Sequence, residues 1–150
     1  MPLDQYVYFA LSSELTSAQE MTARLGVEPD ETTVRGSRGN RPAIPVCHRW
    51  KTVCREPGLR VDEQIACVLN RLRPHTDRIV ELVGQLGQEP DTGNVAVLEI
   101  VRYFGDADEP GQAEPNVQPN LFGWHLDRDA LEFLAATGAV LDVDEYDMTS

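Results

Sequence analysis

Alternating apolar and polar positions predict a strand close to the start of the chain. In residues 6–12 one phase is apolar and is expected to face a core; it consists of Val7, Phe9 and Leu11. The opposite phase begins with Tyr6 and Tyr8. Similar patterns predict further strands over residues 32–35, 46–54, 94–104, 122–126 and 139–146.

Apolar residues at helical spacing predict four helices between these strands. The first follows overlapping capping boxes in Thr16–Glu20 and ends at Gly26, because glycine accepts the left-handed conformation that stops a helix. A second helix follows further along the chain, and Pro74 interrupts its pattern and is expected to open a third. Asp127 caps the fourth helix, and Gly138 ends it.

This order of elements predicts an α+β fold. We expect a two-layer sandwich in which a mostly antiparallel sheet carries helices on one face and leaves the other face open. The succession of strand, helix, glycine and strand occurs at residues 6–35 and again at 95–146. That echo favours a ferredoxin-like fold with an internal duplication. The length of 150 residues fits a single domain, 1–150, with enough chain to bury a core.

Charge is distributed unevenly along the chain. Residues 35–60 hold seven cations and one acid, whereas residues 81–150 hold fifteen acids and two cations. The acidic part includes residues 105–120, which also contain three prolines and are expected to form a flexible acidic loop. We expect this acidic loop to shield part of the basic segment, because the two carry opposite charges. Charge patterns of this kind govern solubility and encounter more than they govern the fold.

Several short structural motifs are spread along nearly the whole chain. They are the stop Leu25-Gly26-Val27-Glu28-Pro29, the pair Arg35-Gly36, Trp50, the paired helices around Pro74, the segment Leu134–Gly138 and the ending Val143-Asp144-Glu145-Tyr146. In these motifs the chain resembles the bacterial domain-of-unknown-function family DUF4279. The resemblance implies no known activity, substrate or catalytic residue.

The tyrosines form the first candidate site. In the predicted strand phases each of them points away from the core; they are Tyr6, Tyr8, Tyr103 and Tyr146. Tyrosine offers a large contact area and a polar tip, which suits interfaces and ligand sites. The alternation therefore indicates a binding surface or homodimer interface on the open sheet face, and the alternative is that these rings only cover a half-exposed sheet.

The basic segment 35–60 forms the second candidate site. Its cations and one indole could hold a phosphate or another small anion; the residues concerned are Arg35, Arg38, Arg41, Arg49 and Trp50. The net charge of −12 repels a polyanion, so a nucleic-acid partner is not expected. The alternative is an exposed, solvated charge run that neighbouring acids partly neutralise.

Two carboxylates form the weakest candidate site. Asp142 and Asp144 share a strand face, a spacing compatible with a hydrolase, and with Glu99 they are alternatively suited to a hard cation. Acids on a terminal strand are more commonly solubilising or protect a sheet edge.

No further motif indicates catalysis or a cofactor, since the three histidines and three cysteines do not fall into the spacing of metal or nucleophile sites. The cysteines are expected to be free, and the absence of an apolar leader or span favours a cytoplasmic protein without a membrane partner. We therefore expect a non-enzymatic interaction module that binds itself or another protein. A small-anion sensor is the alternative, and a hydrolase is the remote one.

Overall fold

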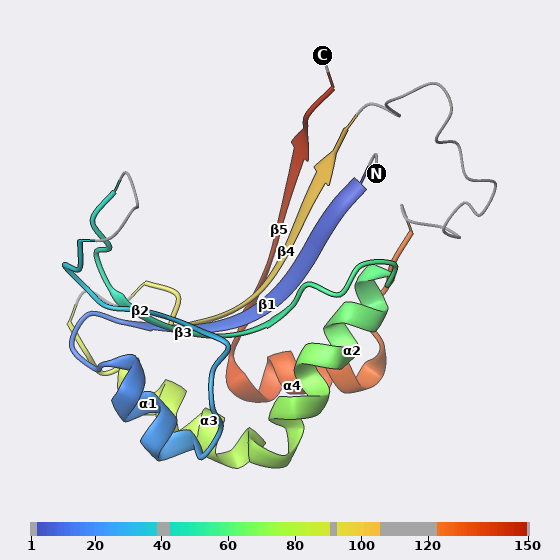
Figure 1. Ribbon diagram of the computed structural model, residues 1–150. Coiled ribbons are helices and arrows are strands. Elements are labelled where there is room, and N and C mark those ends of the chain that lie inside the picture. The colour runs from blue at the N-terminus through green and yellow to red at the C-terminus, as the bar shows by residue number, and fades with distance from the viewer. Residues whose placement is uncertain (1–2, 39–42, 91–92, 106–122, 150) are drawn as a thin grey trace.

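The computed structural model describes residues 3–38, 43–90, 93–105 and 123–149. Five strands in this part of the chain form one sheet with the order β2-β3-β1-β4-β5 (Figure 1). Their bounds are Leu3–Ser13 for β1, Glu31–Thr33 for β2, His48–Cys54 for β3, Ala96–Phe104 for β4 and Val140–Asp147 for β5.

Most neighbouring strands in the sheet are antiparallel, as predicted. Strand β1 lies in the middle and pairs antiparallel with β3 and β4, and β2 pairs antiparallel with β3. Strand β5 is different because it runs parallel to β4, with Glu99 opposite Asp142 and Tyr103 opposite Tyr146. A parallel neighbour requires a crossover connection, and a helix lies between these two strands in the sequence. The sheet therefore ends at an edge strand, β5, that is rich in carboxylates.

The helices form a second layer on one face of the sheet (Figure 1). They are α1 (Ala18–Leu25), α2 (Val61–Leu72), α3 (Thr76–Leu86) and α4 (Arg128–Thr137), with a short 3-10 turn at Arg73–His75. None of the described helices combines the length and apolar character needed to cross a membrane. The α+β class and the helices on a single face agree with the prediction. The other face of the sheet lies along the inside of the bend that β1 makes in Figure 1.

The core lies between the two layers. Val7, Phe9 and Leu11 of β1 are fully buried there, as their strand phase predicts. The rings of Phe9 and Phe133 meet edge to face at 5.5 Å, and this contact joins α4 to the centre of the sheet. Trp50 of β3 is also fully buried, with 0% of its surface exposed.

The predicted helix ends are confirmed by their local geometry. The Ser17 hydroxyl accepts a hydrogen bond from the Glu20 amide at the start of α1. Gly26 follows α1 with φ of 73°, and Gly138 follows α4 with φ of 71°, both in the left-handed region. At Gly26 an added Cβ would lie 2.7 Å from Arg78 Nη1, the end of a flexible side chain that can move away, so the left-handed backbone is what favours glycine there.

Two predicted elements differ in the structure. Residues 123–126 are not a strand, and Phe122 lies outside the described residues. Trp124 and Leu126 instead pack against the core beside α4, because β5 already occupies the position next to β4. Pro74 does not open α3 directly but lies in the 3-10 turn that joins α2 to α3.

The finer topology predictions are not confirmed. Strands β1 and β2 are separated in the sheet by β3, whereas β4 and β5 are direct neighbours, so the two halves of the chain pair differently. The ferredoxin-like comparison and the internal duplication stay predictions. Of the expected acidic loop at 105–120, only Gly105 is among the described residues. The rest of that loop lies outside them.

Candidate functional site

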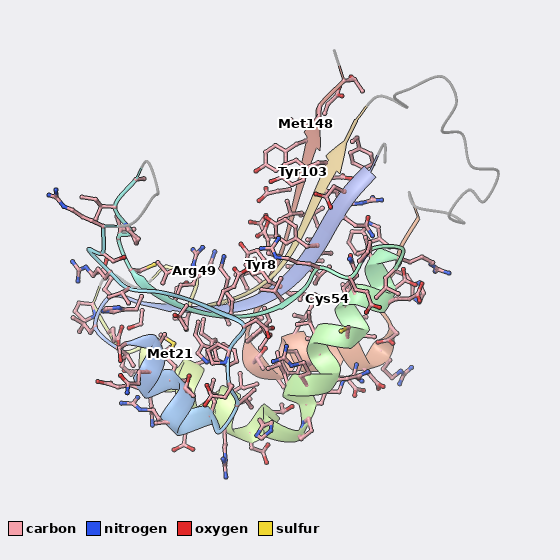
Figure 2. All side chains as sticks on the ribbon, in the orientation of Figure 1. Tyr8, Met21, Arg49, Cys54, Tyr103 and Met148 are labelled. Carbon is pink, nitrogen blue, oxygen red and sulfur yellow. The ribbon has the colours of Figure 1, made fainter. Side chains whose placement is uncertain are left out.

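The open face of the sheet carries the side chains that alternate with the core positions. All four tyrosines lie on it: Tyr6 and Tyr8 from β1, Tyr103 from β4 and Tyr146 from β5. In Figure 2, Tyr8, Arg49 and Tyr103 lie on this side of the sheet, and Met21 lies on the helical side. The strand phases that predict a tyrosine-bearing open face therefore agree with the structure.

The tyrosines are arranged as two stacked pairs. The rings of Tyr6 and Tyr8 lie 6.2 Å apart at 19°, and those of Tyr103 and Tyr146 lie 5.0 Å apart at 15°. The first pair follows one strand, and the second joins the parallel neighbours β4 and β5. Tyr146 remains 46% exposed despite its stacking. The two pairs form an aromatic surface that extends across three strands.

Cations from β3 and from the residue after it lie on the first tyrosine pair. Lys51 Nζ is 4.2 Å from the centre of the Tyr8 ring, and the Arg55 guanidinium is 4.2 Å from the centre of the Tyr6 ring. Such contacts contribute about 0.5–1 kcal/mol each at exposed sites. Arg49, two residues before Lys51, donates from Nε to the Ser12 hydroxyl at 3.3 Å. The β3 side of the open face is therefore basic.

Carboxylates occupy the opposite side of the open face. Glu99 of β4 lies directly across from Asp142 of β5, and Asp144 follows two residues later on the same face. One ligand oxygen from each of the three carboxylates lies within 4.8 Å of the others. Burial, followed by the hydrogen-bonding and charge effects of Asp144 and Asp142, raises the pKa of Glu99 to about 8.

The hydroxyls of Tyr6 and Tyr8 remain protonated in this environment. Burial and the negative charge of Glu99 raise the pKa of Tyr8 to about 12. The pKa of Tyr6 is raised by burial and by its neighbour Tyr103, against the opposing effect of Arg55. Tyr6 and Tyr8 therefore act as neutral hydrogen-bonding groups at physiological pH and not as bases.

The second predicted site is only partly assembled. Arg35 and Arg38 are exposed between β2 and β3, and Arg35 Nη1 donates to the Glu14 carbonyl at 3.2 Å. Arg49 lies on the open face instead, and Arg41 lies outside the described residues. The cations of the basic segment thus do not converge on one point within the described part of the chain.

The predicted role of Trp50 in this second site is wrong. Its indole is enclosed in the core, where Nε1 donates to the Thr22 hydroxyl at 3.1 Å, so it cannot stack on an incoming ligand. The physical reason is strand alternation: Arg49 and Lys51 face the open side, and the residue between them must face the helices.

The contact of Lys51 and Arg55 with the tyrosines was not predicted. A signal for it is present in the sequence, because Arg49, Lys51 and Arg55 alternate with the buried positions Thr52 and Cys54. What the sequence does not contain is the pairing of β3 with β1, which brings Val53 opposite Tyr8.

The helical side offers a second cluster of polar residues, between α2 and α4. His125 Nδ1 lies 3.6 Å from Asp62 Oδ2, but the same oxygen already accepts from Arg60 Nη2 at 2.7 Å. His125 is exposed, and Asp62 is bound to a cation. The cluster is explained as the ion pairing of the α2 start, so the open face is the better candidate for function.

The comparisons with known proteins identify a family without assigning an activity. Neither the curated proteins nor the solved structures include a match to this chain. The sequence pattern of the family described as a domain of unknown function, DUF4279, matches residues 4–148. That range includes β1 from Asp4 onward, the four described helices and the three carboxylates of the open face. The chain therefore belongs to the DUF4279 family.

Proposed function

We propose that the protein acts by binding rather than by catalysis, and that a second copy of the chain covers the open face of its sheet. The observation that carries this proposal is the gathering of all four tyrosines, as two stacked pairs, on the face that no described helix covers. Aromatic rings that keep a polar tip are enriched at protein interfaces and at the residues that dominate binding energy.

The charges on either side of the tyrosines favour self-association over an unrelated partner. A two-fold contact places each surface patch against the same patch of the partner, turned by half a rotation. Arg49 and Lys51 lie on one side of the face, and Asp142 and Asp144 lie on the other. A two-fold axis that runs along the strands therefore places the basic side of each copy on the acidic side of its partner. In this orientation the face is complementary to itself.

The experiment is a mass measurement in solution by sedimentation equilibrium. We expect twice the chain mass at micromolar concentration, and a monomer after Tyr8→Arg, which adds a cation in the middle of the aromatic surface. Leu131→Arg on the exposed side of α4 is the matched control and should leave the dimer intact. A wild-type protein that stays monomeric at micromolar concentration contradicts the proposal.

The other hypotheses have less support from the geometry. A small-anion sensor retains Arg35 and Arg38, but the buried Trp50 no longer contributes to it. A hydrolase needs an ionised base and a substrate pocket, whereas the raised pKa of Glu99 favours a shared proton among the three carboxylates. A cytoplasmic location is consistent with free cysteines in the described chain and belongs to the same proposal.

A further inference from the structure

The three carboxylates of the open face come from two strands that meet only in the folded chain. Glu99 and Asp142 are directly opposite each other in the parallel pair β4–β5, and Asp144 is the next residue on that face of β5. Ligand oxygens from all three lie within 4.8 Å of one another. The three are graded in exposure, since Glu99 is buried, Asp144 is intermediate and Asp142 is exposed.

The buried member of this cluster has an unpartnered oxygen. Glu99 is only 4% exposed, and its Oε1 is enclosed without a hydrogen-bond partner. A buried carboxylate oxygen without a donor is costly, and such groups in folded proteins normally have a partner in the protein, an ordered water or an ion. An acidic cluster on a surface is by itself unremarkable, but this enclosed oxygen calls for a positive partner.

The described part of the protein does not supply a cation to the cluster. No ion pair within residues 3–38, 43–90, 93–105 and 123–149 includes Glu99, Asp142 or Asp144. The neighbour from β1 is Tyr8, which is neutral, and Lys51 from β3 lies over the ring of that tyrosine. Three carboxylates thus converge where the surrounding elements leave them uncompensated.

We propose that Glu99, Asp142 and Asp144 form a binding site for one hard divalent cation. Carboxylate oxygens suit Ca²⁺, Mn²⁺ and Mg²⁺, and the cluster contains neither the nitrogen nor the sulfur ligands typical of zinc. The exposed side of the cluster, at Asp142, leaves room for water molecules to complete the coordination. A bound dication leaves the acidic side of the open face with one net negative charge, so the proposed self-association keeps its complementarity.

A proton shared among the carboxylates is the competing explanation. Burial and the two neighbouring carboxylates raise the pKa of Glu99, which favours a proton held between the carboxylate oxygens in place of a cation. If a proton takes this position, titration with calcium or manganese shows no binding.

The experiment is calorimetric titration of the chelator-treated full chain with calcium chloride and, separately, manganese chloride. We expect one cation per chain and a Kd of about 1 mM or tighter, the weak end of protein calcium sites. Glu99→Gln and Asp142→Asn should each weaken binding at least tenfold. Asp142 is exposed, so its variant keeps the test valid if Glu99→Gln does not fold.

The matched control is Asp129→Asn with Glu132→Gln, which removes two acids from α4 on the helical side and should leave the affinity unchanged. The inference is overturned if neither cation binds at about 1 mM, or if the affinity survives both Glu99→Gln and Asp142→Asn. It does not depend on self-association. A monomer that binds calcium contradicts the proposed function alone, and a dimer that does not bind calcium contradicts the cation site alone.

Discussion

Asp30 shows how one side chain holds two elements together. Its Oδ2 accepts hydrogen bonds from the Val53 amide at 2.7 Å and from Arg71 Nη1 at 2.6 Å. The first bond fixes the chain before β2 against β3, and the second ties the same point to α2. Burial alone raises the pKa of Asp30, but the bonds from Arg71 and Val53 outweigh it and hold the pKa below its ordinary value.

We therefore predict that Asp30→Asn lowers the free energy of unfolding at pH 7 by about 1 kcal/mol, a modest loss because the ion pair is partly exposed. A depressed folded-state pKa stabilises the protein above the unfolded value of about 4. The difference between wild type and variant should disappear as pH falls from about 4 through the folded-state pKa.

Urea unfolding at a series of pH values measures this difference. Glu28→Gln, which removes an exposed acid two residues earlier, is the control and should show no such pH dependence. Parallel stability profiles for wild type and Asp30→Asn would contradict the assignment.

Among the elements, α4 makes the parallel pairing of β4 and β5 possible because it lies in the connection between these two strands. The helix begins where the Asp127 carboxylate accepts a hydrogen bond from the Ala130 amide at 2.8 Å. Phe133 then packs on Phe9. A weaker helix start therefore affects the attachment of β5 as well as the helix itself.

Asp127→Ala should destabilise the protein by about 1 kcal/mol, because it leaves a first-turn amide without its acceptor. Asp127→Ser keeps an oxygen at the cap and should recover most of the loss. Thermal unfolding of the two variants, with hydrogen exchange of the β5 amides, is the measurement. Equal stability of the alanine and serine variants would show that the cap contributes nothing.

Local signals account for the elements that the sequence predicts correctly. Capping bonds and left-handed glycines act over three or four residues, so Ser17, Gly26 and Gly138 are recognisable without the fold. Strand phase is equally local, and the alternation in the sequence therefore predicts the correct face for the tyrosines.

Long-range pairing accounts for what the sequence does not predict. The apolar residues Trp124 and Leu126 resemble a strand, but the sheet position beside β4 belongs to β5. Similarly, the sequence shows that Asp142 and Asp144 share a face, but only the register of β5 on β4 brings Glu99 to them. Trp50 lies between basic neighbours in the sequence, but strand alternation turns its side chain into the core.

For the whole molecule, the separation of charge along the sequence becomes a separation across the open face. The β3 side carries Arg49 and Lys51, and the β5 side carries Asp142 and Asp144. Ion pairs among the described residues join other cations of the basic segment to acids from the first half of the chain, such as Arg55 with Glu31 at 3.0 Å. The separation of charge across the open face therefore comes from the residues on that face and not from the other cations of the basic segment.

Charge-swapped chains test whether this separation directs self-association. A chain with Arg49→Glu and Lys51→Glu has an acidic open face, and one with Asp142→Lys and Asp144→Lys has a basic one. We expect each to be monomeric because like charges meet, and an equimolar mixture to restore a dimer.

Sedimentation of the separate and mixed chains provides the measurement. The control carries Glu81→Lys and Glu132→Lys on exposed helical positions, with the same change in net charge as the second chain, and should dimerise alone. A mixture that remains monomeric would rule out pairing of the two sides of the face.

Strand β5 lies at the edge of the sheet, where another extended chain could add to it. An uncovered edge strand offers its backbone to any passing extended chain, and the sheet could in that way grow without limit. Strand β5 carries a carboxylate at four of its eight residues, namely Asp142, Asp144, Glu145 and Asp147. Hydrogen bonds from Thr149 lower the pKa of Asp147. These charges disfavour strand addition at the edge and leave the open face of the sheet available. Protonation of the carboxylates in acid removes that protection.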